Sequence, residues 1–197
     1  ALKTETGWVG AEGATYNFTG SRTNVGGTGL AENVFTYELK EGTLAVNYEI
    51  SATYGDLVVN KSGTMTVSAE NYSEAYDGEA HGIQNVTPSV ETGTTLYYST
   101  DNETWSETAP TWTNVEVDSE EAVASHTVYV KAVNSNYEDA TTSATVTITK
   151  KAVTLESATL TKTYDGEALE NGTTALKTET GWGGAEGAAY NFTGSRT

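Results

Sequence analysis

Cysteine is absent from this chain of 197 residues, and basic side chains are scarce. The missing cysteines exclude disulfides, thiolate metal sites and a cysteine nucleophile. Only 10 Lys and Arg stand against 27 Asp and Glu, so the net charge is −17. Such a chain repels nucleic acid phosphates and anionic membranes. No apolar run approaches the roughly 20 residues of a membrane-spanning helix. We therefore expect no nucleic acid partner and no membrane insertion.

The residues that are abundant favour β-structure, because the chain has 12 Tyr, 4 Trp and many Val and Thr. Residues 144–149 alternate apolar and threonine side chains, and residues 127–132 alternate in the same way. Alternation with period two places one set of side chains on a core face and the other in water. Further strands are predicted at 34–39, 45–51, 56–60, 64–69 and 95–100. Turn signals separate them, and this pattern predicts an all-β fold of tandem Ig-like antiparallel β-sandwich modules in an elongated array. Strand order is not readable, so β-grasp-like modules carrying a short helix remain the alternative.

The strongest internal signal is a repeat of 23 residues. Residues 175–197 repeat residues 1–23 at an offset of 174, with differences only at Val9/Gly183 and Thr15/Ala189. The chain therefore contains one full period and the start of the next.

A fainter repeat divides that period into two modules. Tyr-Asp-Gly occurs at 76–78 and again at 164–166, and Asn-Tyr-Glu occurs at 47–49 and again at 136–138. From this order we predict three segments. Residues 63–150 form a complete module, residues 1–62 form the C-terminal part of the other module type, and residues 151–197 form its N-terminal part.

The two partial modules predict open strand edges. Either the sequence is cut from a longer continuous chain, or separate molecules complete each other head to tail. In the second case residues 151–197 of one molecule pair with the later part of 1–62 of the next. We expect the isolated chain to oligomerise.

Several stretches together give the chain a family resemblance. The first partial module carries Gly20–Gly26, Asn47–Ile50 and Tyr54–Leu57, and the second carries Lys162–Leu169. The complete module carries Ala75–Gly82, Tyr98–Asp101, Val128–Ala132 and Ala144–Lys150. In order and spacing these resemble YDG-type and MBG-like tandem repeats of bacterial, Firmicutes-type cell-surface proteins. The middle module departs from them by an acidic insertion at 116–121.

The resemblance implies a secreted, cell-wall-associated protein whose repeats act as a structural stalk or spacer, or build a fibre. A module that binds glycan or host protein is the alternative. The implied partners are neighbouring repeats of the same chain or head-to-tail copies of itself. The resemblance implies no catalytic residues, and no triad or nucleotide-binding motif is present. We therefore expect no enzymatic activity and no cofactor.

Three groups of residues are candidates for structural or binding roles. Turns, with tyrosines that anchor them in the core, are predicted at Tyr76, Asp77, Gly78, Tyr164, Asp165, Gly166, Asn47, Tyr48, Asn136 and Tyr137. Oxygen-rich loops could hold calcium at Asp101, Asp118, Glu120 and Asp139, although no EF-hand spacing is present and solvated turns are the other interpretation. Trp105 and Trp112 could stack on a sugar ring, or could instead fill a thin core.

Overall fold

The computed structural model describes residues 2, 4–170, 176–182, 186–191 and 195–196. These residues form an all-β protein without an α-helix. The strands are β1 (Ala14–Phe18), β2 (Phe35–Leu39), β3 (Val67–Glu70), β4 (Tyr72–Ala75), β5 (Gln84–Pro88), β6 (Thr94–Ser99), β7 (His126–Asn134), β8 (Tyr137–Thr149), β9 (Thr154–Ser157), β10 (Leu169–Glu170), β11 (Leu176–Thr180) and β12 (Ser195–Arg196). No helix among the described residues has the length and apolarity to cross a bilayer.

The chain divides into two compact units. The first comprises Ala1–Met65, Thr92–Thr94 and Val133–Asp139, and the second comprises Thr66–Glu91, Thr95–Ala132 and Ala140–Thr197. The tip of the hairpin formed by β7 and β8 thus belongs to the first unit, while the bodies of both strands belong to the second.

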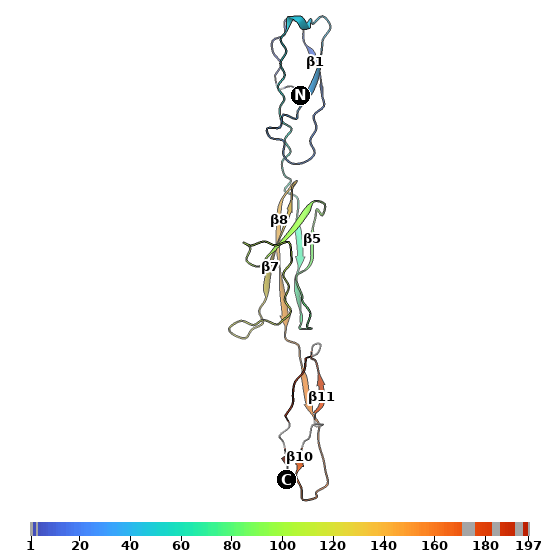
Figure 1. The fold of residues 1–197 in the computed structure, drawn as a ribbon, viewed down its shortest axis with the longest axis vertical. Coiled ribbons are helices and arrows are strands. Elements are labelled where there is room, and N and C mark those ends of the chain that lie inside the picture. Colours follow the sequence, from blue (N-terminus) through green and yellow to red (C-terminus); the bar gives the residue numbers. More distant parts are fainter. Residues whose placement is uncertain (1, 3, 171–175, 183–185, 192–194, 197) are drawn as a thin grey trace. The chain divides into compact units, whose positions relative to one another are not determined.

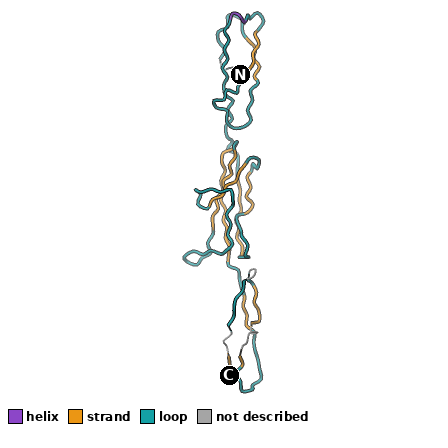
Figure 2. Tube along the Cα trace, in the orientation of Figure 1, coloured by secondary structure: helices purple, strands orange, loops and turns teal. Residues whose placement is uncertain are grey.

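The first unit contains one antiparallel pair, β1 with β2, in the register Ala14↔Leu39 to Phe18↔Phe35. Much of the remaining chain runs as loops, as Figure 2 shows. Two isolated bridges, Gly26↔Val59 and Asn33↔Gly55, hold these loops together.

The prediction of a strand at 45–51 is wrong. Residues Ala45–Asn47 form a 3₁₀ turn, in which the Asn47 and Tyr48 amides donate to the carbonyls of Leu44 and Ala45 at 3.0 and 3.1 Å. An apolar segment becomes a strand only where a neighbouring backbone accepts its hydrogen bonds. Here Val46 stays 90% exposed, whereas Tyr48 is partly buried, so the segment does not bury one face as a strand would. The strand predicted at 56–60 is likewise reduced to a bridge at Val59.

The second unit is built on a four-stranded sheet in the order β4-β8-β7-β6, in which β7 and β8 are the long strands (Figure 1). Three two-stranded sheets, β3-β5, β9-β11 and β10-β12, complete it, and the sheets pack in a sandwich-like arrangement. The core cluster consists of Tyr72, Val128, Val146 and Ile148. Val128 and Val146 are fully buried, in agreement with the alternation of both strand sequences.

One strand pair departs from the predicted antiparallel arrangement. β4 pairs with β8 in parallel, from Tyr72↔Val146 to Ala75↔Thr149. β4 is an early strand of its module and β8 the last, and both run in the same direction. Two strands so far apart in the sequence need no tight turn between them, so a parallel ladder is available to them.

Candidate functional site

The first unit contains a pocket of about 640 Å³. Three segments line it: residues 2–8, the hairpin formed by β1 and β2, and residues 48–55. Its aromatic lining consists of Trp8, Tyr16, Phe18, Phe35, Tyr37, Tyr48 and Tyr54. Pockets with apolar and aromatic walls and a few polar groups are the usual binding sites of proteins.

Phe35 is the centre of the aromatic wall. Its ring lies 5.5 Å from that of Tyr16, 5.6 Å from that of Phe18 and 5.3 Å from that of Tyr54. These are ordinary contact distances for aromatic pairs. Phe18 and Tyr54 nevertheless keep 39% and 40% of their surface exposed. The aromatic rings therefore contact one another within the wall, while part of their surface remains accessible to a binding partner.

Glu5 fixes the polar side of the pocket. Its Oε1 accepts a hydrogen bond from Trp8 Nε1 at 2.7 Å and another from the Tyr16 hydroxyl at 2.6 Å. The hydrogen bond to Glu5 raises the pKa of Tyr16 above its ordinary value. Trp8 also packs edge-on against Tyr48, with ring centroids 4.8 Å apart. Residues 5–8 are thus held against the pocket by side chains.

Tyr48 joins the pocket to the neighbouring loop. Its hydroxyl donates to Glu12 Oε2 and accepts from the Val9 amide at 3.2 Å. The hydrogen bond to Glu12 raises the pKa of Tyr48. A tyrosine after an Asn was predicted here as a turn anchor, and the structure places it on the pocket wall.

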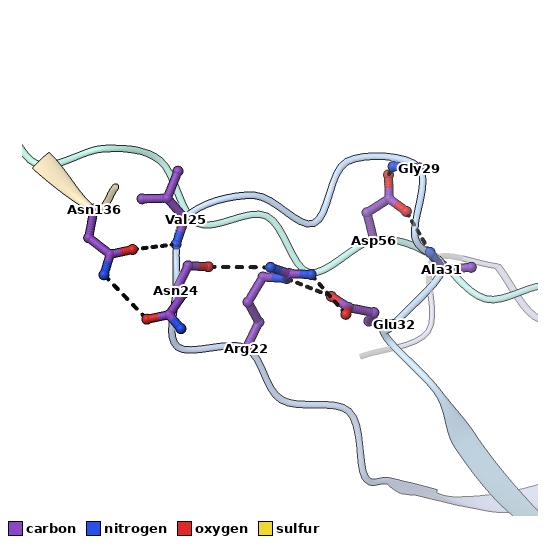
Figure 3. Close-up of polar contacts among 8 residues, drawn as sticks. All are labelled: Arg22, Asn24, Val25, Gly29, Ala31, Glu32, Asp56 and Asn136. Atoms are coloured by element: carbon purple, nitrogen blue, oxygen red, sulfur yellow. Dashed lines mark hydrogen bonds and ion pairs between the residues drawn. The ribbon is translucent and has the colours of Figure 1, made fainter. Parts of the chain in front are cut away.

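A polar network joins residues 22–32 of the first unit to Asp56 (Figure 3). Arg22 forms a two-pronged ion pair with Glu32, with Nε–Oε2 at 2.6 Å and Nη2–Oε1 at 2.8 Å. Asp56 accepts from the amides of Gly29 at 2.7 Å and Ala31 at 2.9 Å, and these bonds lower its pKa. The network closes the loop 22–32 against residue 56.

Asn136, at the tip of the hairpin formed by β7 and β8, joins the same network. Its Oδ1 accepts from the Val25 amide at 2.9 Å, and its Nδ2 donates to Asn24 Oδ1 at 3.3 Å (Figure 3). The backbone beside it holds Ser62, whose amide donates to the Asn136 carbonyl at 3.0 Å, and the Glu138 amide donates to the Ser62 carbonyl at 2.8 Å. Tyr137 forms a parallel bridge with Ser62.

The two Tyr-Asp-Gly sequences share a turn but differ in packing. Asp77 Oδ1 accepts from the Glu79 amide at 2.9 Å, Asp165 Oδ1 accepts from the Glu167 amide at 3.0 Å, and Gly78 and Gly166 have φ of 91° and 83°. Bonds from His81 and Glu79 lower the pKa of Asp77. Bonds from Lys162 and Glu167 lower that of Asp165.

The tyrosines of these turns lie in different surroundings. Tyr76 packs against the core cluster of the second unit. Tyr164 is 91% exposed, so the expectation that it anchors its turn in a core is wrong in this structure. The reason is that the described residues around it offer no core comparable to the one that Tyr76 contacts.

The proposed calcium residues form hydrogen-bonded turns. Asp101 Oδ1 accepts from Ser99 Oγ at 2.8 Å and from the amides of Glu103 and Thr104 at 2.8 and 2.7 Å. These bonds, the Thr104 amide first, hold the pKa of Asp101 far below its usual range. Asp118 Oδ1 accepts from the Glu120 and Ala122 amides at 2.8 and 3.0 Å.

Asp139 lies on β8, apart in sequence from both of these loops. The described residues bring together no group of three or more His, Asp or Glu side chains that could hold a metal ion.

The two tryptophans of the proposed ligand loop have separate environments. Trp112 packs against the core cluster and stacks on His126 at 4.4 Å. Trp105 is half-buried, with Lys131 Nζ 4.2 Å from its ring centroid. It borders a shallow hollow shared with Asn102, Tyr129 and Thr142. The structure therefore does not form a single platform from the pair.

Sequence reasoning missed the pocket and the polar network around Arg22. The contact between Val25 and Asn136 spans 111 residues, and no local pattern marks such a pair. A signal for the pocket did exist: aromatic residues are dense in 1–54, a segment predicted to be only part of a module. Comparison with protein-family models, curated proteins and solved structures found no match to this chain.

Proposed function

We propose that this chain is a structural repeat of a secreted bacterial cell-surface protein, acting as a stalk or spacer or as the unit of a fibre. Its modules are Ig-like in this proposal, and its partners are further copies of the same repeats. The observation that supports it is the 23-residue stretch that occurs twice at an offset of 174 residues.

The two copies of that stretch make the same local contact. Trp8 Nε1 donates to Glu5 Oε1 at 2.7 Å, and Trp182 Nε1 donates to Glu179 Oε1 at 2.5 Å. This one contact is local to the repeat, although the strand partners of the two copies differ. A unit that carries a local contact of its own can be multiplied along a chain, which is the property that a length-giving array requires.

Within the first unit, Ser62 at the end of the first partial module is hydrogen-bonded on both sides to the tip of the hairpin formed by β7 and β8. The negative charge of −17 adds solubility to a protein exposed outside the cell.

The length of the molecule tests this proposal. Chains carrying one, two and three copies of the 174-residue period should be compared by small-angle X-ray scattering. A spacer adds a constant increment to the maximum dimension for each period. A maximum dimension that grows only with the cube root of chain length would show a compact assembly and contradict a stalk.

A glycan-binding module is the second proposal, and Trp105 is the observation that favours it. The ring is half-buried beside a hollow with amide and hydroxyl groups. Flat rings beside polar groups suit a sugar, since the ring stacks on its apolar face. A glycan array with the wild type and Trp105→Ala tests it. Binding that the substitution abolishes supports the idea, and an array without signal removes it.

A further inference from the structure

The 23-residue repeat has different strand partners in its two copies. In the second copy, β11 pairs with β9 through Leu176↔Ser157, Thr178↔Glu156, Glu179↔Leu155 and Thr180↔Thr154. Near the end of the same copy, β12 pairs with β10 through Leu169↔Arg196 and Glu170↔Ser195. The segment 151–170 therefore pairs with both ends of the repeat.

The first copy lacks these partners. Residues 2–6 have the same sequence, Leu-Lys-Thr-Glu-Thr, as residues 176–180. Among the described residues, 4–9 and 21–22 belong to no strand and no isolated bridge. The first copy does have β1 paired with β2, whereas the matching residues 188–191 of the second copy lie outside any strand. Each copy thus has the partners that the other lacks.

The pocket borders the segment of the first copy that lacks these partners. Leu2, Thr4 and Thr6 line it, on the segment that matches β11. The exposed aromatic wall of Phe18 and Tyr54 faces the same pocket. β-strand addition uses backbone without a strand partner beside uncovered apolar surface, and both are present here.

The segment 151–170 carries apolar and aromatic side chains that are exposed. Leu155 is 51% exposed, Leu160 is 38% exposed and Tyr164 is 91% exposed. The equivalent of Tyr164 in the complete module, Tyr76, packs against the core cluster. Among the described residues, Tyr164 thus lacks the core contact that Tyr76 has.

We propose that the pocket of the first unit binds the segment 151–170 of a second copy of this chain. In this proposal, residues 154–157 of the second molecule pair with residues 2–6 of the first. Leu169–Glu170 of the second molecule pair with Ser21–Arg22 of the first. This inference rests on the proposed function as a structural repeat and names the strands that join one copy to the next.

The exchange of strand partners conserves the backbone hydrogen bonds, because both acceptors have the same sequence. When 154–157 leave β11 for residues 2–6 of another copy, they replace one ladder by an equivalent one. The gain is the burial of the pocket wall together with Leu155 and Tyr164. The donor and acceptor are different surfaces, so the contact is heterologous and each added copy leaves one of each open.

Three substitutions in the full chain test the proposal. Tyr164→Ala removes a side chain that is 91% exposed, so it should leave the fold unchanged and weaken association. Thr4→Pro prevents regular pairing at the acceptor edge, because proline lacks the amide donor. Thr178→Pro makes the same change at the matching position of the second copy, weakens the pairing of β9 with β11 and releases the donor segment.

The chains are refolded from urea at high protein concentration, and their mass is measured by light scattering after size exclusion. We expect the wild type to give a series of integer multiples of 20.8 kDa. Tyr164→Ala and Thr4→Pro should reduce the multimer fraction severalfold, and Thr178→Pro should increase it. Far-ultraviolet circular dichroism checks that each variant is folded.

A wild type that stays monomeric at its highest soluble concentration would overturn the inference. Equal association of all four chains would also overturn it, since unspecific adhesion does not distinguish Thr4 from its copy Thr178. As a direct probe, a synthetic peptide with the sequence of residues 151–170 should bind the wild type and compete with multimer formation, whereas a scrambled peptide should not. Neither failure affects the scattering test of the spacer, in which repeats are joined covalently.

Discussion

Replacing Val146 with alanine tests which face of β8 forms the core of the second unit. Val146 is 0% exposed and belongs to one cluster with Tyr72, Val128 and Ile148. The substitution removes two carbon atoms, and each buried CH₂ contributes about 0.8 kcal/mol to stability. Measured losses for a single deleted core methyl run from about 0.5 to 1.5 kcal/mol. We therefore expect the free energy of unfolding to fall by about 2 kcal/mol.

This loss is large enough to measure. In a domain of this size about 1 kcal/mol lowers Tm by roughly 4 °C, so Val146→Ala should lower it by roughly 8 °C. Urea unfolding followed by tryptophan fluorescence gives the free energy. A background carrying Trp8→Phe and Trp182→Phe confines the signal to Trp105 and Trp112, which both lie in the second unit.

The control is Thr141→Ala, at an exposed position of the same strand. It should change stability by less than about 0.5 kcal/mol, as exposed substitutions generally do. The reasoning is refuted if Val146→Ala changes stability no more than Thr141→Ala. It is also refuted if the exposed position proves the more sensitive one, because the two residues would then have exchanged faces.

Three other outcomes are expected. Gly27→Ala should destabilise the first unit by about 2 kcal/mol or more, because Gly27 has φ of 105° and a Cβ there would collide with the Leu57 carbonyl. Gly42 has φ of 85° but open space around it, so Gly42→Ala should lower the free energy of unfolding by less in the same urea titration. The pKa of Asp101 is lowered in the folded chain, so the contribution of this carboxylate to stability is complete above about pH 4 and declines as the pH falls further. Asp101→Asn should therefore make the urea midpoint depend less on pH between about pH 2 and 5. A pH dependence equal to that of the wild type would contradict this. Millimolar calcium should leave Tm unchanged in differential scanning calorimetry, and a rise that grows with calcium concentration would show a specific site.

The sequence was most informative about the long strands of the second unit. In residues 127–132 and 144–149 the apolar and polar side chains alternate strictly. A shift of the strand register by one residue would expose every apolar side chain to water. That penalty makes the buried face of β7 and β8 predictable from the order of the residues alone. Val128, Val130 and Val146 are indeed fully buried.

The same pattern failed at residues 45–51, where Val46 lies on the surface. Alternation specifies which face a strand would bury, but a strand also needs a neighbouring backbone, and that neighbour is a tertiary property. The parallel pairing of β4 with β8 was unpredictable for a related reason, since it joins residues 72–75 to 146–149.

The candidate site was partly predictable. The open edges on the partial modules stay a prediction from the repeat, and the pocket beside residues 2–8 lies on one of the segments for which they are predicted. The side chains that shape it were not predictable, because Glu5 is one of many acidic residues and its bonds to Trp8 and Tyr16 depend on the folded path. Asn136 was singled out only as a turn residue, and its bond to Val25 required the structure.

The parallel alignment of β4 and β8 determines how the second unit responds to tension. A force that pulls the chain apart draws Tyr72 and Thr149 in opposite directions along neighbouring strands. Their backbone bonds, together with the bond from the Tyr76 amide to the Thr149 carbonyl at 2.9 Å, are then loaded in shear and must fail together. An antiparallel pair at the same place would unzip one bond at a time, at a lower force.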